Sequence, residues 1–387
     1  MGIGERTLEG LVSRAGLTGF GAYGGKRVLV TGHTGFKGSW LTLWLHMLGA
    51  KVTGLALAPE DPSLYRDARI EELCDGRVGD IRDAVAVSGA VETSYPEVVL
   101  HLTAQALVSR GHEDPLATFE INVIGTALLL ETLRRRARPC AVVIVTSDKC
   151  YRPSDRPHRE TDPLGGDVPY SASKAAAELL VAAYRASYLP VNEIARHGIP
   201  IATARAGNVI GGGDWAKDRI VPDTVRALMR GAPVVVRNPD HVRPWQHVLD
   251  ALDGYLRIGA GLLGSPTGDA SRAELADAWN LGPTLDDDRP VRAVVETVIS
   301  KWGSGSWVAD PSEALEREVP YLQLDPRKAH DRLGWAPRWD LDAALALTVR
   351  WYRSYAEGAR GPELRSETMD QIRGHMSESA RRRSTSA

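Results

Sequence analysis

A glycine-rich turn between a short apolar strand and a helix is the feature that most constrains this chain. Residues 27–31 (RVLVT) are apolar and β-branched, residues 32–38 have the spacing G-x-x-G-x-x-G, and residues 36–48 have the length and apolar character of a helix. Glycines at such a turn let the backbone approach a pyrophosphate, and the helix N-terminus presents unpaired N–H groups. An isolated motif also suits an ordinary tight turn, but at the first strand of a βαβ series it favours dinucleotide binding.

Further apolar, β-branched runs alternate with stretches of helical periodicity through the first half of the chain. This alternation predicts an α/β fold with a Rossmann-type, doubly wound parallel sheet. Helices on both faces of such a sheet explain why the predicted strands are almost wholly apolar. The strands are predicted at residues 51–57, 96–102 and 141–146, and the helices between them at residues 85–93 and 119–136.

The composition and the pattern of apolar segments change after residue 206. Eight of the ten tryptophans lie beyond residue 210, among glycine-rich loops and short apolar segments, which predicts a smaller C-terminal α/β lobe. The expected organisation is an N-terminal extension at residues 1–24, a dinucleotide-binding domain at 25–210 to which 241–284 return, the second lobe at 211–240 and 285–355, and a polar C-terminal tail at 356–387.

Charge and cysteine content limit the partners and the compartment. The 47 basic and 49 acidic residues nearly cancel, so no overall field attracts nucleic acid or an anionic bilayer. Cys74, Cys140 and Cys150 lack C-x-x-C spacing, which argues against disulfides and structural zinc and favours the cytoplasm. No metal site is expected. The sequence shows no signal-peptide pattern and no uninterrupted apolar run of about 18 residues, so secretion and membrane spanning are disfavoured.

Tyr170 and Lys174 form a Y-x-x-x-K pair in a strongly helical segment, so both side chains lie on one helix face. A phenol has a pKa of about 10, and bringing it to about 7 requires a nearby ammonium and an oxidised nicotinamide ring. An isolated pair of this kind is more often an exposed surface contact. Ser147 ends the preceding strand at the edge of the sheet where α/β proteins bind ligands, which favours the catalytic interpretation.

At these residues the chain resembles the extended short-chain dehydrogenase/reductases that modify nucleotide sugars, and within them the CDP-glucose 4,6-dehydratases. The resemblance covers roughly residues 20–355. Its motifs are TGHTGFKGSWL (31–41), GDIRD (79–83), HLTAQ (101–105), TSDKCY (146–151), RAGNVIGGGDW (205–215), RPWQHV (243–248) and WNLGP (279–283). It implies NAD as the cofactor, CDP-glucose as the substrate, bound in part by the second lobe, and a homodimer.

The resemblance also implies a mechanism. Tyr170, aided by Ser147 and Lys174, removes the proton of the sugar 4-hydroxyl while a hydride passes from C4 to NAD+. The 4-ketone acidifies the C5 proton, Asp148 protonates the departing 6-hydroxyl, and the hydride returns to C6. Lys149 stands where dehydratases acting on dTDP-glucose carry Glu. It either removes the C5 proton, which we favour, or stays charged and stabilises the enolate.

The motif positions and the resemblance together assign the binding residues. An arginine fork suits a diphosphate, and a flat indole can line a nucleotide pocket. The expected cofactor-binding residues are Gly32, Thr34, Gly35, Phe36, Gly38, Asp80, Ile81, Leu102, Thr103, Ala104, Gln105, Tyr170 and Lys174. The expected substrate-binding residues are Asn208, Trp215, Arg219, Arg243, Trp245 and Gln246.

The choice between NAD and NADP is left open at one position. The ribose-binding carboxylate is expected about twenty residues after the glycine motif, but Leu57-Ala58-Pro59 stands there, with Glu60 and Asp61 just beyond.

Two alternative functions stay open. The first is another nucleotide-sugar 4,6-dehydratase or epimerase, acting on a dTDP-, UDP- or GDP-hexose, because Thr103 replaces an alanine and residues 153–157 are unfamiliar. The second is a catalytically silent NAD-binding regulator. A regulator needs the glycine loop but not the complete set of Ser147, Tyr170 and Lys174, which argues against it.

Overall fold

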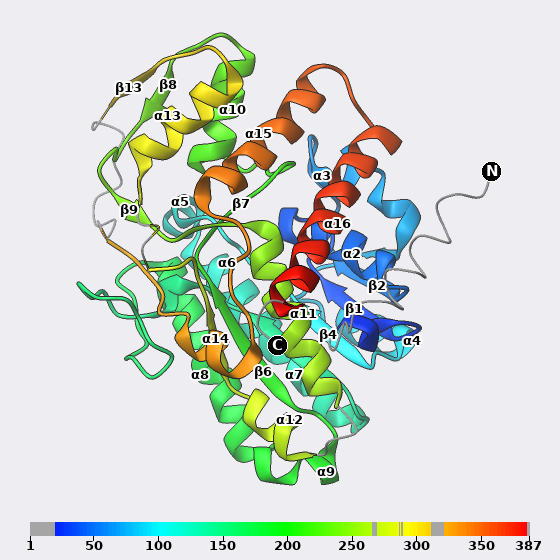
Figure 1. Cartoon of the computed structure of the whole chain (residues 1–387). Helices are drawn as coiled ribbons and strands as arrows, with labels where there is room; N and C mark the ends of the chain where they lie inside the picture. The colour runs from blue at the N-terminus through cyan, green and yellow to red at the C-terminus, as the bar shows by residue number, and fades with distance from the viewer. Residues whose placement is uncertain (1–19, 265–268, 286, 288, 311–320, 385–387) are drawn as a thin grey trace, which may run out of the picture.

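A seven-stranded parallel sheet forms the centre of the computed structural model, which describes residues 20–264, 269–285, 287, 289–310 and 321–384 (Figure 1). The strand order is β3-β2-β1-β4-β5-β6-β11, so the order reverses between β1 and β4. The Rossmann-type fold with a smaller α/β lobe is confirmed. The strands are β1 (Arg27–Thr31), β2 (Lys51–Ala56), β3 (Asp75–Val78), β4 (Val98–His101), β5 (Ala141–Val145), β6 (Ile201–Ala206) and β11 (Ala278–Leu281).

Helices cover both faces of this sheet, as the apolar strands require. On one face α2 (Phe36–Met47) and α11 (Val248–Leu263) pack on the central strands. On the other face lie α4 (Ala84–Ser94), α7 (Thr126–Arg136) and α8 (Pro169–Ser187). The side chains between the layers form two separate apolar cores, one on each face.

The predicted strands at 27–31, 51–57, 96–102 and 141–146 match β1, β2, β4 and β5 to within two residues at each end. The edge strand β3 was not predicted because its sequence, Asp-Gly-Arg-Val, is largely exposed and has no apolar run. Strand β11 pairs with β6, which brings part of 241–284 back to the main sheet. The domain limits themselves stay a prediction.

The second lobe lies above the carboxyl ends of the strands (Figure 1). It is built from α10 (Ile220–Met229), α13 (Val291–Trp302) and α15 (Leu341–Ala356), with β8 (Val234–Val236) paired to β13 (Trp307–Ala309) and β9 (Val242–Arg243) paired to β12 (Arg289–Pro290). Between the lobe and the sheet, β7 (Asn208–Ile210) pairs with β10 (Trp245–His247). The chain therefore crosses between the two parts several times.

Short elements connect these layers. They are η1 (Phe20–Tyr23), α3 (Leu64–Asp67), η2 (Ile70–Leu73), α5 (Val108–Glu113), α6 (Pro115–Phe119), η3 (Glu120–Gly125), η4 (Asp148–Cys150), η5 (Val191–Glu193), α9 (Ile194–His197), α12 (Asp269–Leu275) and α14 (Arg327–Leu333). Most of the predicted extension at 1–24 lies outside the described residues, and its last turn, η1, buries Phe20 and Tyr23.

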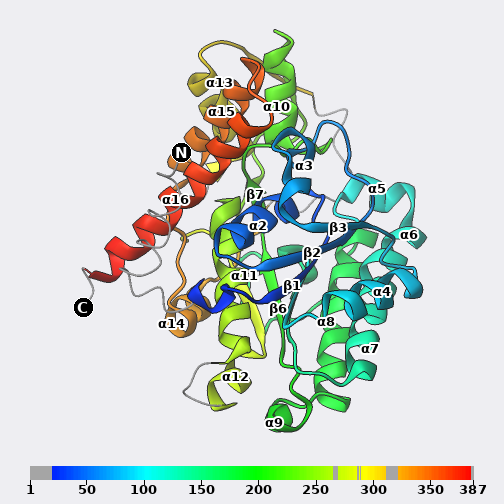
Figure 2. The same cartoon turned by 90° about the vertical axis from the view of Figure 1, so that its right-hand side faces the viewer.

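The expectation of a polar tail at 356–387 is wrong for most of that segment. Residues Pro362–Ser384 form the helix α16, which runs from the second lobe along α2 (Figure 2). Leu364 and Ile372 are fully buried, and Nε2 of His375 forms a hydrogen bond with Oδ1 of Asp250 at 2.9 Å. The segment is polar on average, but Leu364, Ile372 and His375 recur at helical spacing and pack against the rest of the protein.

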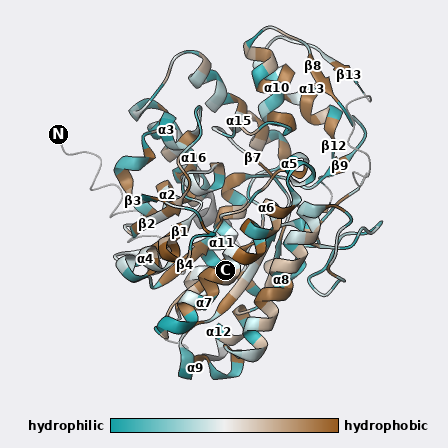
Figure 3. Ribbon diagram, turned by 180° about the vertical axis from the view of Figure 1, so that it is seen from behind, coloured by the Kyte–Doolittle hydropathy of each residue, from teal (hydrophilic) through white to brown (hydrophobic). Residues whose placement is uncertain are grey.

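The stretch Pro115–Arg136 is the one described segment that is long and apolar enough to cross a membrane by length and composition. Its helices pack on α4 and α8, which accounts for much of its apolar character. Leu116 and Ile124 stay exposed, as does Leu179 on the neighbouring helix α8. In Figure 3 much of the ribbon of α6, α7 and α8 has the colour of hydrophobic residues.

The packing of α16 predicts a stability effect. Replacing the buried Leu364 by Ala should lower the free energy of unfolding by about 2–5 kcal/mol, because it leaves a cavity under the helix. Ser366→Ala on the exposed face of the same helix is the control and should change it by no more than about 0.5 kcal/mol. Urea denaturation measures both. Equal, small changes for the two variants would mean that α16 does not contribute to the folded core.

Candidate active site

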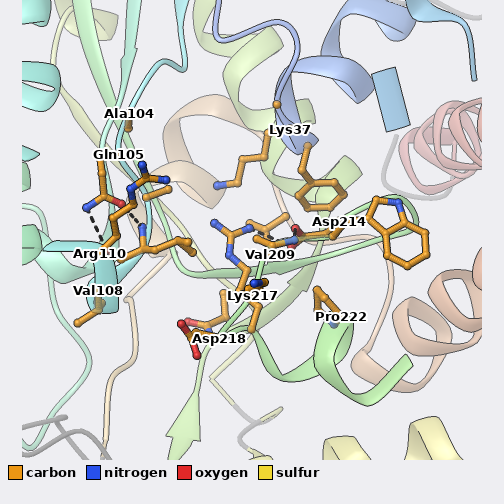
Figure 4. Close-up of a pocket in the computed structure, with 18 of the residues that line it drawn as sticks. Lys37, Ala104, Gln105, Val108, Arg110, Val209, Asp214, Lys217, Asp218 and Pro222 are labelled. Carbon is orange, nitrogen blue, oxygen red and sulfur yellow. Dashed lines mark hydrogen bonds and ion pairs between the residues drawn. The ribbon is translucent and has the colours of Figure 1, made fainter. Parts of the chain in front are cut away.

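A cavity of about 1640 Å³ lies between the carboxyl edge of the sheet and the second lobe. It passes the reversal of strand order between β1 and β4, the place where open α/β sheets bind ligands. Figure 4 shows side chains from both parts of the molecule pointing into it. The cavity therefore brings together residues that are more than a hundred positions apart in the sequence.

The glycine-rich turn forms one wall of the cavity. Gly32 has φ +76°, and a Cβ there would lie 2.9 Å from the backbone nitrogen of Thr103. A Cβ on Gly38 would lie 2.0 Å from the carbonyl oxygen of Gly32. Only glycine fits at these two positions, and the turn leaves the N-terminus of α2 open toward the cavity. This is the cradle that a dinucleotide pyrophosphate needs.

All the predicted cofactor-binding residues line this cavity. Thr34 donates to the carbonyl of Leu57 at 3.1 Å, which ties the glycine turn to the end of β2. The backbone N–H of Gln105 donates to Oδ1 of Asn122, and its side-chain amide donates to Oγ1 of Thr118, both at 2.9 Å. The lining includes Gly32, Thr34, Gly35, Phe36, Gly38, Asp80, Ile81, Leu102, Thr103, Ala104, Gln105, Tyr170 and Lys174.

No carboxylate stands at the very end of β2, but Glu60 and Asp61 also line the cavity, and both are exposed. Asp80 lies further along the same wall, where its carboxylate pairs with Arg82 at 2.7 Å. A carboxylate for the ribose is thus available from the loop after β2 rather than from the strand itself.

The predicted catalytic residues meet at the ends of β5 and α8. The Ser147 hydroxyl donates to Oδ1 of Asp148 at 2.9 Å and accepts from the backbone N–H of Lys149 at 3.2 Å. Tyr170 and Lys174 lie in the first turns of α8, and both line the same cavity as the three strand-end residues. The sequence motifs therefore converge on one place.

Burial controls the proton equilibria of these groups. Burial raises the pKa of Tyr170 to about 12, while the neighbouring Ser147 hydroxyl opposes that increase. Burial lowers the pKa of Lys174 to about 8. The pKa of Asp148 is raised, also by burial, although Lys149 and Ser147 oppose it. Without ligand, Tyr170 and Asp148 are therefore biased toward their protonated forms.

The substrate side of the cavity contains five of the six residues predicted for it, namely Asn208, Trp215, Arg219, Arg243 and Trp245. Arg219 pairs with Asp214 at 2.9 Å, and the buried Arg243 shares a hydrogen bond with His241 at 3.0 Å. Gln246, the sixth residue predicted to bind the substrate, is not among the lining residues, and its role in binding stays a prediction. Alternation along β10 turns its side chain away from the cavity, and it donates to the carbonyl of Leu281 on β11 at 2.7 Å.

Lys37 is a site residue that the sequence interpretation missed. It stands inside the glycine motif, extends from α2 into the cavity, and points between Gln105 and Asp214 (Figure 4). Its ammonium lies 3.4 Å from the Tyr255 hydroxyl. Burial, helped by the cations of Arg219 and Lys174, lowers its pKa to about 7, although Asp148 and Asp214 oppose this. A lysine between motif glycines was the available signal.

A hydrogen bond across the cavity was also missed. Ser109 on α5 donates to Oδ2 of Asp218 at 2.9 Å, and Asp218 pairs with Arg237 at 3.2 Å. Asp218 has φ +60°, an unusual conformation for a residue with a side chain. This contact joins the sheet domain to the loop before α10. Neither spacing nor composition could have indicated it.

His33 of the glycine motif and His247 of the RPWQHV motif pack against aromatic rings and do not line the cavity. His33 is buried edge-on against Tyr65, and His247 is buried against Trp40 and Trp339. Among the described residues, no group of three or more His, Cys, Asp or Glu side chains could hold a metal ion.

A family model described as GDP-mannose 4,6 dehydratase matches residues 29–348, which span the sheet, the glycine cradle and most of the second lobe. The chain belongs to this dehydratase family.

Curated and solved relatives agree with that membership of the dehydratase family. The CDP-glucose 4,6-dehydratase of Salmonella typhimurium is 44% identical over 338 residues, which cover 86% of this chain and 92% of the relative. The solved dTDP-glucose 4,6-dehydratase DesIV of Streptomyces venezuelae, with NAD and TYD bound, is 26% identical with a TM-score of 0.67, and covers 85% of this chain and 97% of its own. The Thermus thermophilus UDP-glucose 4-epimerase complex with NAD is 27% identical with a TM-score of 0.70, covering 84% and 99%.

The buried Lys37 predicts a pH-dependent stability effect. Its pKa is lower in the folded chain than in the unfolded chain, so folding carries a penalty that is fully present below about pH 7 and disappears as the pH rises toward 10.5. Lys37→Met should therefore raise the free energy of unfolding, by an amount on the order of a few kcal/mol at pH 6.5, and by progressively less above pH 8. Urea denaturation across that range measures it.

The exposed Lys217 provides the control for this prediction, because it lines the same cavity without being buried. Lys217→Met should leave the pH dependence of stability unchanged. If Lys37→Met and Lys217→Met behave alike, Lys37 is not desolvated in the folded protein.

Proposed function

We propose that this protein is an NAD-dependent CDP-glucose 4,6-dehydratase that forms CDP-4-keto-6-deoxyglucose. The observation that carries the proposal is the convergence of Ser147, Asp148, Lys149 and Tyr170 in the cavity that also holds the glycine cradle. The Asp148-Lys149 pair favours the CDP-glucose enzyme over dehydratases that act on dTDP-glucose. The 44% identity to the Salmonella enzyme supports the same substrate.

The cavity fits a nicotinamide dinucleotide. Close backbone packing excludes a Cβ at Gly32 and Gly38 and seats the N-terminus of α2 at the cavity, where it would hold the pyrophosphate. The wall from Leu102 to Gln105 would accept the remainder. NAD, which is bound by the solved dehydratase and epimerase relatives, supplies a hydride acceptor that is regenerated within each turnover. All other steps belong to the side chains of the protein.

Tyr170 is the base for oxidation at C4. It takes the proton of the sugar 4-hydroxyl, and Ser147 orients that hydroxyl. The pKa of about 12 for the buried phenol is too high for this role at neutral pH. Lys174, when protonated, favours the phenolate electrostatically, as does the positive charge of an oxidised nicotinamide. Tyr170 therefore acts as a base only when the oxidised dinucleotide is bound in the cavity.

Asp148 and Lys149 carry out the loss of water. Burial raises the pKa of Asp148, so this carboxyl can hold the proton that it gives to the departing 6-hydroxyl. Lys149 is half-buried and lines the cavity beside it. In its neutral form it takes the C5 proton that the 4-ketone has made acidic, whereas in its charged form it would stabilise the enolate instead. The proton from Asp148 leaves with the 6-hydroxyl oxygen as water, and the proton taken from C5 balances that loss. When the hydride is returned to C6, a proton that has exchanged with solvent is returned to C5, which completes the 6-deoxy-4-keto product.

The second lobe binds the nucleotide part of the substrate. Arg219 and Arg243 present guanidinium groups to the cavity, and these match the oxygens of a diphosphate. Asn208 adds a polar contact at the end of β7, and the rings of Trp215 and Trp245 line the same region.

An enzymatic assay tests this function. The protein and NAD+ are incubated in heavy water, separately with CDP-glucose and with dTDP-, UDP- and GDP-hexoses, and the products are identified by mass and NMR. We expect a 6-deoxy-4-keto product from CDP-glucose with deuterium at C5. Formation of the product only from a dTDP-, UDP- or GDP-hexose would contradict CDP-glucose as the substrate. A C4 epimer formed without loss of water would identify an epimerase.

Tyr170→Phe is the matched control for that assay. It should bind NAD with unchanged affinity but reduce turnover by at least about 100-fold, because general base catalysis contributes at least that much. Unimpaired turnover would exclude Tyr170 as the base, while lost NAD binding would point to a structural effect.

We also propose that the enzyme is a cytoplasmic homodimer. The exposed apolar residues Leu116, Ile124 and Leu179 lie on neighbouring helices, and a second copy of the chain would cover them. The free thiols of Cys74, Cys140 and Cys150 suit a reducing compartment.

Sedimentation velocity tests the dimer. Leu179→Lys should shift the protein toward monomer, because it places a charge in the apolar interface. Val308→Lys, at an exposed position on the second lobe, is the control and should leave the distribution unchanged. A protein that is monomeric before mutation would disprove the proposed assembly.

A further inference from the structure

Glu178 is a buried carboxylate on the same helix as Tyr170 and Lys174. It lies on α8, one turn after Lys174 and two turns after Tyr170, and its side chain is 2% exposed. The i, i+4 spacing places Glu178 and Lys174 on the same helix face. A charged carboxylate at such a depth is costly unless it is paired and hydrogen-bonded, so its surroundings need an explanation.

Three donors fix this carboxylate. Arg205 of β6 donates to Oε2 at 2.7 Å, Thr203 of the same strand donates to Oε2 at 2.8 Å, and Thr146 donates to Oε1. Thr146 immediately precedes Ser147. The network therefore ties the helix that carries Tyr170 and Lys174 to the strand end that carries the serine hydroxyl.

The guanidinium of Arg205 is itself held. It donates to the Tyr151 hydroxyl at 2.6 Å and to the backbone carbonyl of Glu160 at 3.1 Å, and it lies over the Tyr151 ring. Arg205 cannot follow the Glu178 carboxylate freely, so the carboxylate keeps its position and its charge. Burial works to raise the pKa of Glu178, but Arg205 and the two threonines bring it below the usual value.

The charge on Glu178 acts on Lys174. Burial lowers the pKa of Lys174, and the negative charge of the Glu178 carboxylate opposes that decrease. The nearby Cys150 thiol adds no such charge at physiological pH, because burial raises its own pKa. A buried lysine that lost this support would be neutral over more of the physiological pH range, and a neutral amine cannot favour the phenolate of Tyr170.

We propose that Glu178 is a positioning residue for the reaction, whose fixed carboxylate keeps Lys174 in the charged state that promotes ionisation of Tyr170. This inference rests on the proposed function. The titratable groups around Lys174 come from several elements, and they are Tyr170 and Glu178 on α8, Cys150 on η4, His101 on β4 and Lys37 on α2. Glu178 is the carboxylate in this set.

Glu178→Gln in the full chain tests the proposal, because it keeps the shape of the side chain and removes its charge. The basic limb of the pH profile of kcat/KM with CDP-glucose should move to lower pH by about one unit. The second measurement needs no substrate. The titration of Lys174, followed by NMR of protein labelled with 13C at the lysine Cε positions and assigned with Lys174→Met, should move by a similar amount.

Matched variants separate charge from structure. Thr203→Val removes one hydrogen bond to the same carboxylate but leaves its charge, so the basic limb should stay in place. Glu178→Asp keeps a carboxylate at this position, so its basic limb should lie where it does in the parent protein. If Glu178→Gln does not fold because Arg205 is left unpaired, Glu178→Gln/Arg205→Met removes both buried charges and is measured in its place. A Lys174 titration that is unchanged in the folded Gln variant would overturn the proposal. Absence of turnover in the parent protein would refute the proposed function alone, since the NMR titration is independent of it.

Discussion

Backbone packs directly on backbone where β1 turns into α2, and the rest of the site depends on this contact. Gly38 meets the carbonyl of Gly32, and Gly32 meets the backbone of Thr103 at the end of β4. The contact seats α2 at the reversal of strand order and opens its N-terminus toward the cavity. It also fixes where Lys37 projects, so the same turn determines the anion cradle and one of the buried cations near it.

The cavity is rich in cations before any ligand arrives. Eleven lysines and arginines line it, among them Lys37, Lys174 and Arg219, against eight aspartates and glutamates, so the basic residues outnumber the acidic ones. Burial alone would drive such groups toward neutrality. A dinucleotide and a nucleotide sugar each bring a diphosphate, so loading the site would restore charge balance. The lowered pKa values of Lys37 and Lys174 are consistent with a site adapted to the loaded state rather than the empty one.

The sequence was informative where local pattern and fold coincide. Glycine spacing, the apolar runs of the central strands and the Y-x-x-x-K pair are short-range signals, and they located the glycine turn and the face of α8 that lines the cavity. Strand β3 was not predicted because an exposed edge strand needs no apolar run. The orientation of Gln246 depends on the pairing of β10, and the hydrogen bonds of Glu178 depend on strands that are distant in sequence. Such contacts arise only when the sheet is assembled.

The helix α16 has a consequence for how the molecule is made. Trp351 of α15 donates to Thr368 of α16 at 3.0 Å, Arg365 donates to the carbonyl of Ala68 at 2.8 Å, and His375 contacts Asp250. α16 is therefore synthesised after every element that it joins, and β11 likewise enters a sheet whose other strands precede it by more than seventy residues. Chain growth can assemble the dinucleotide half early, but the contacts of α16 form only after every element that it joins has been made. A ribosome stalled before α16 would hold a chain with its sheet largely formed and without the hydrogen bonds that this helix makes to α11, to α15 and to the end of α3.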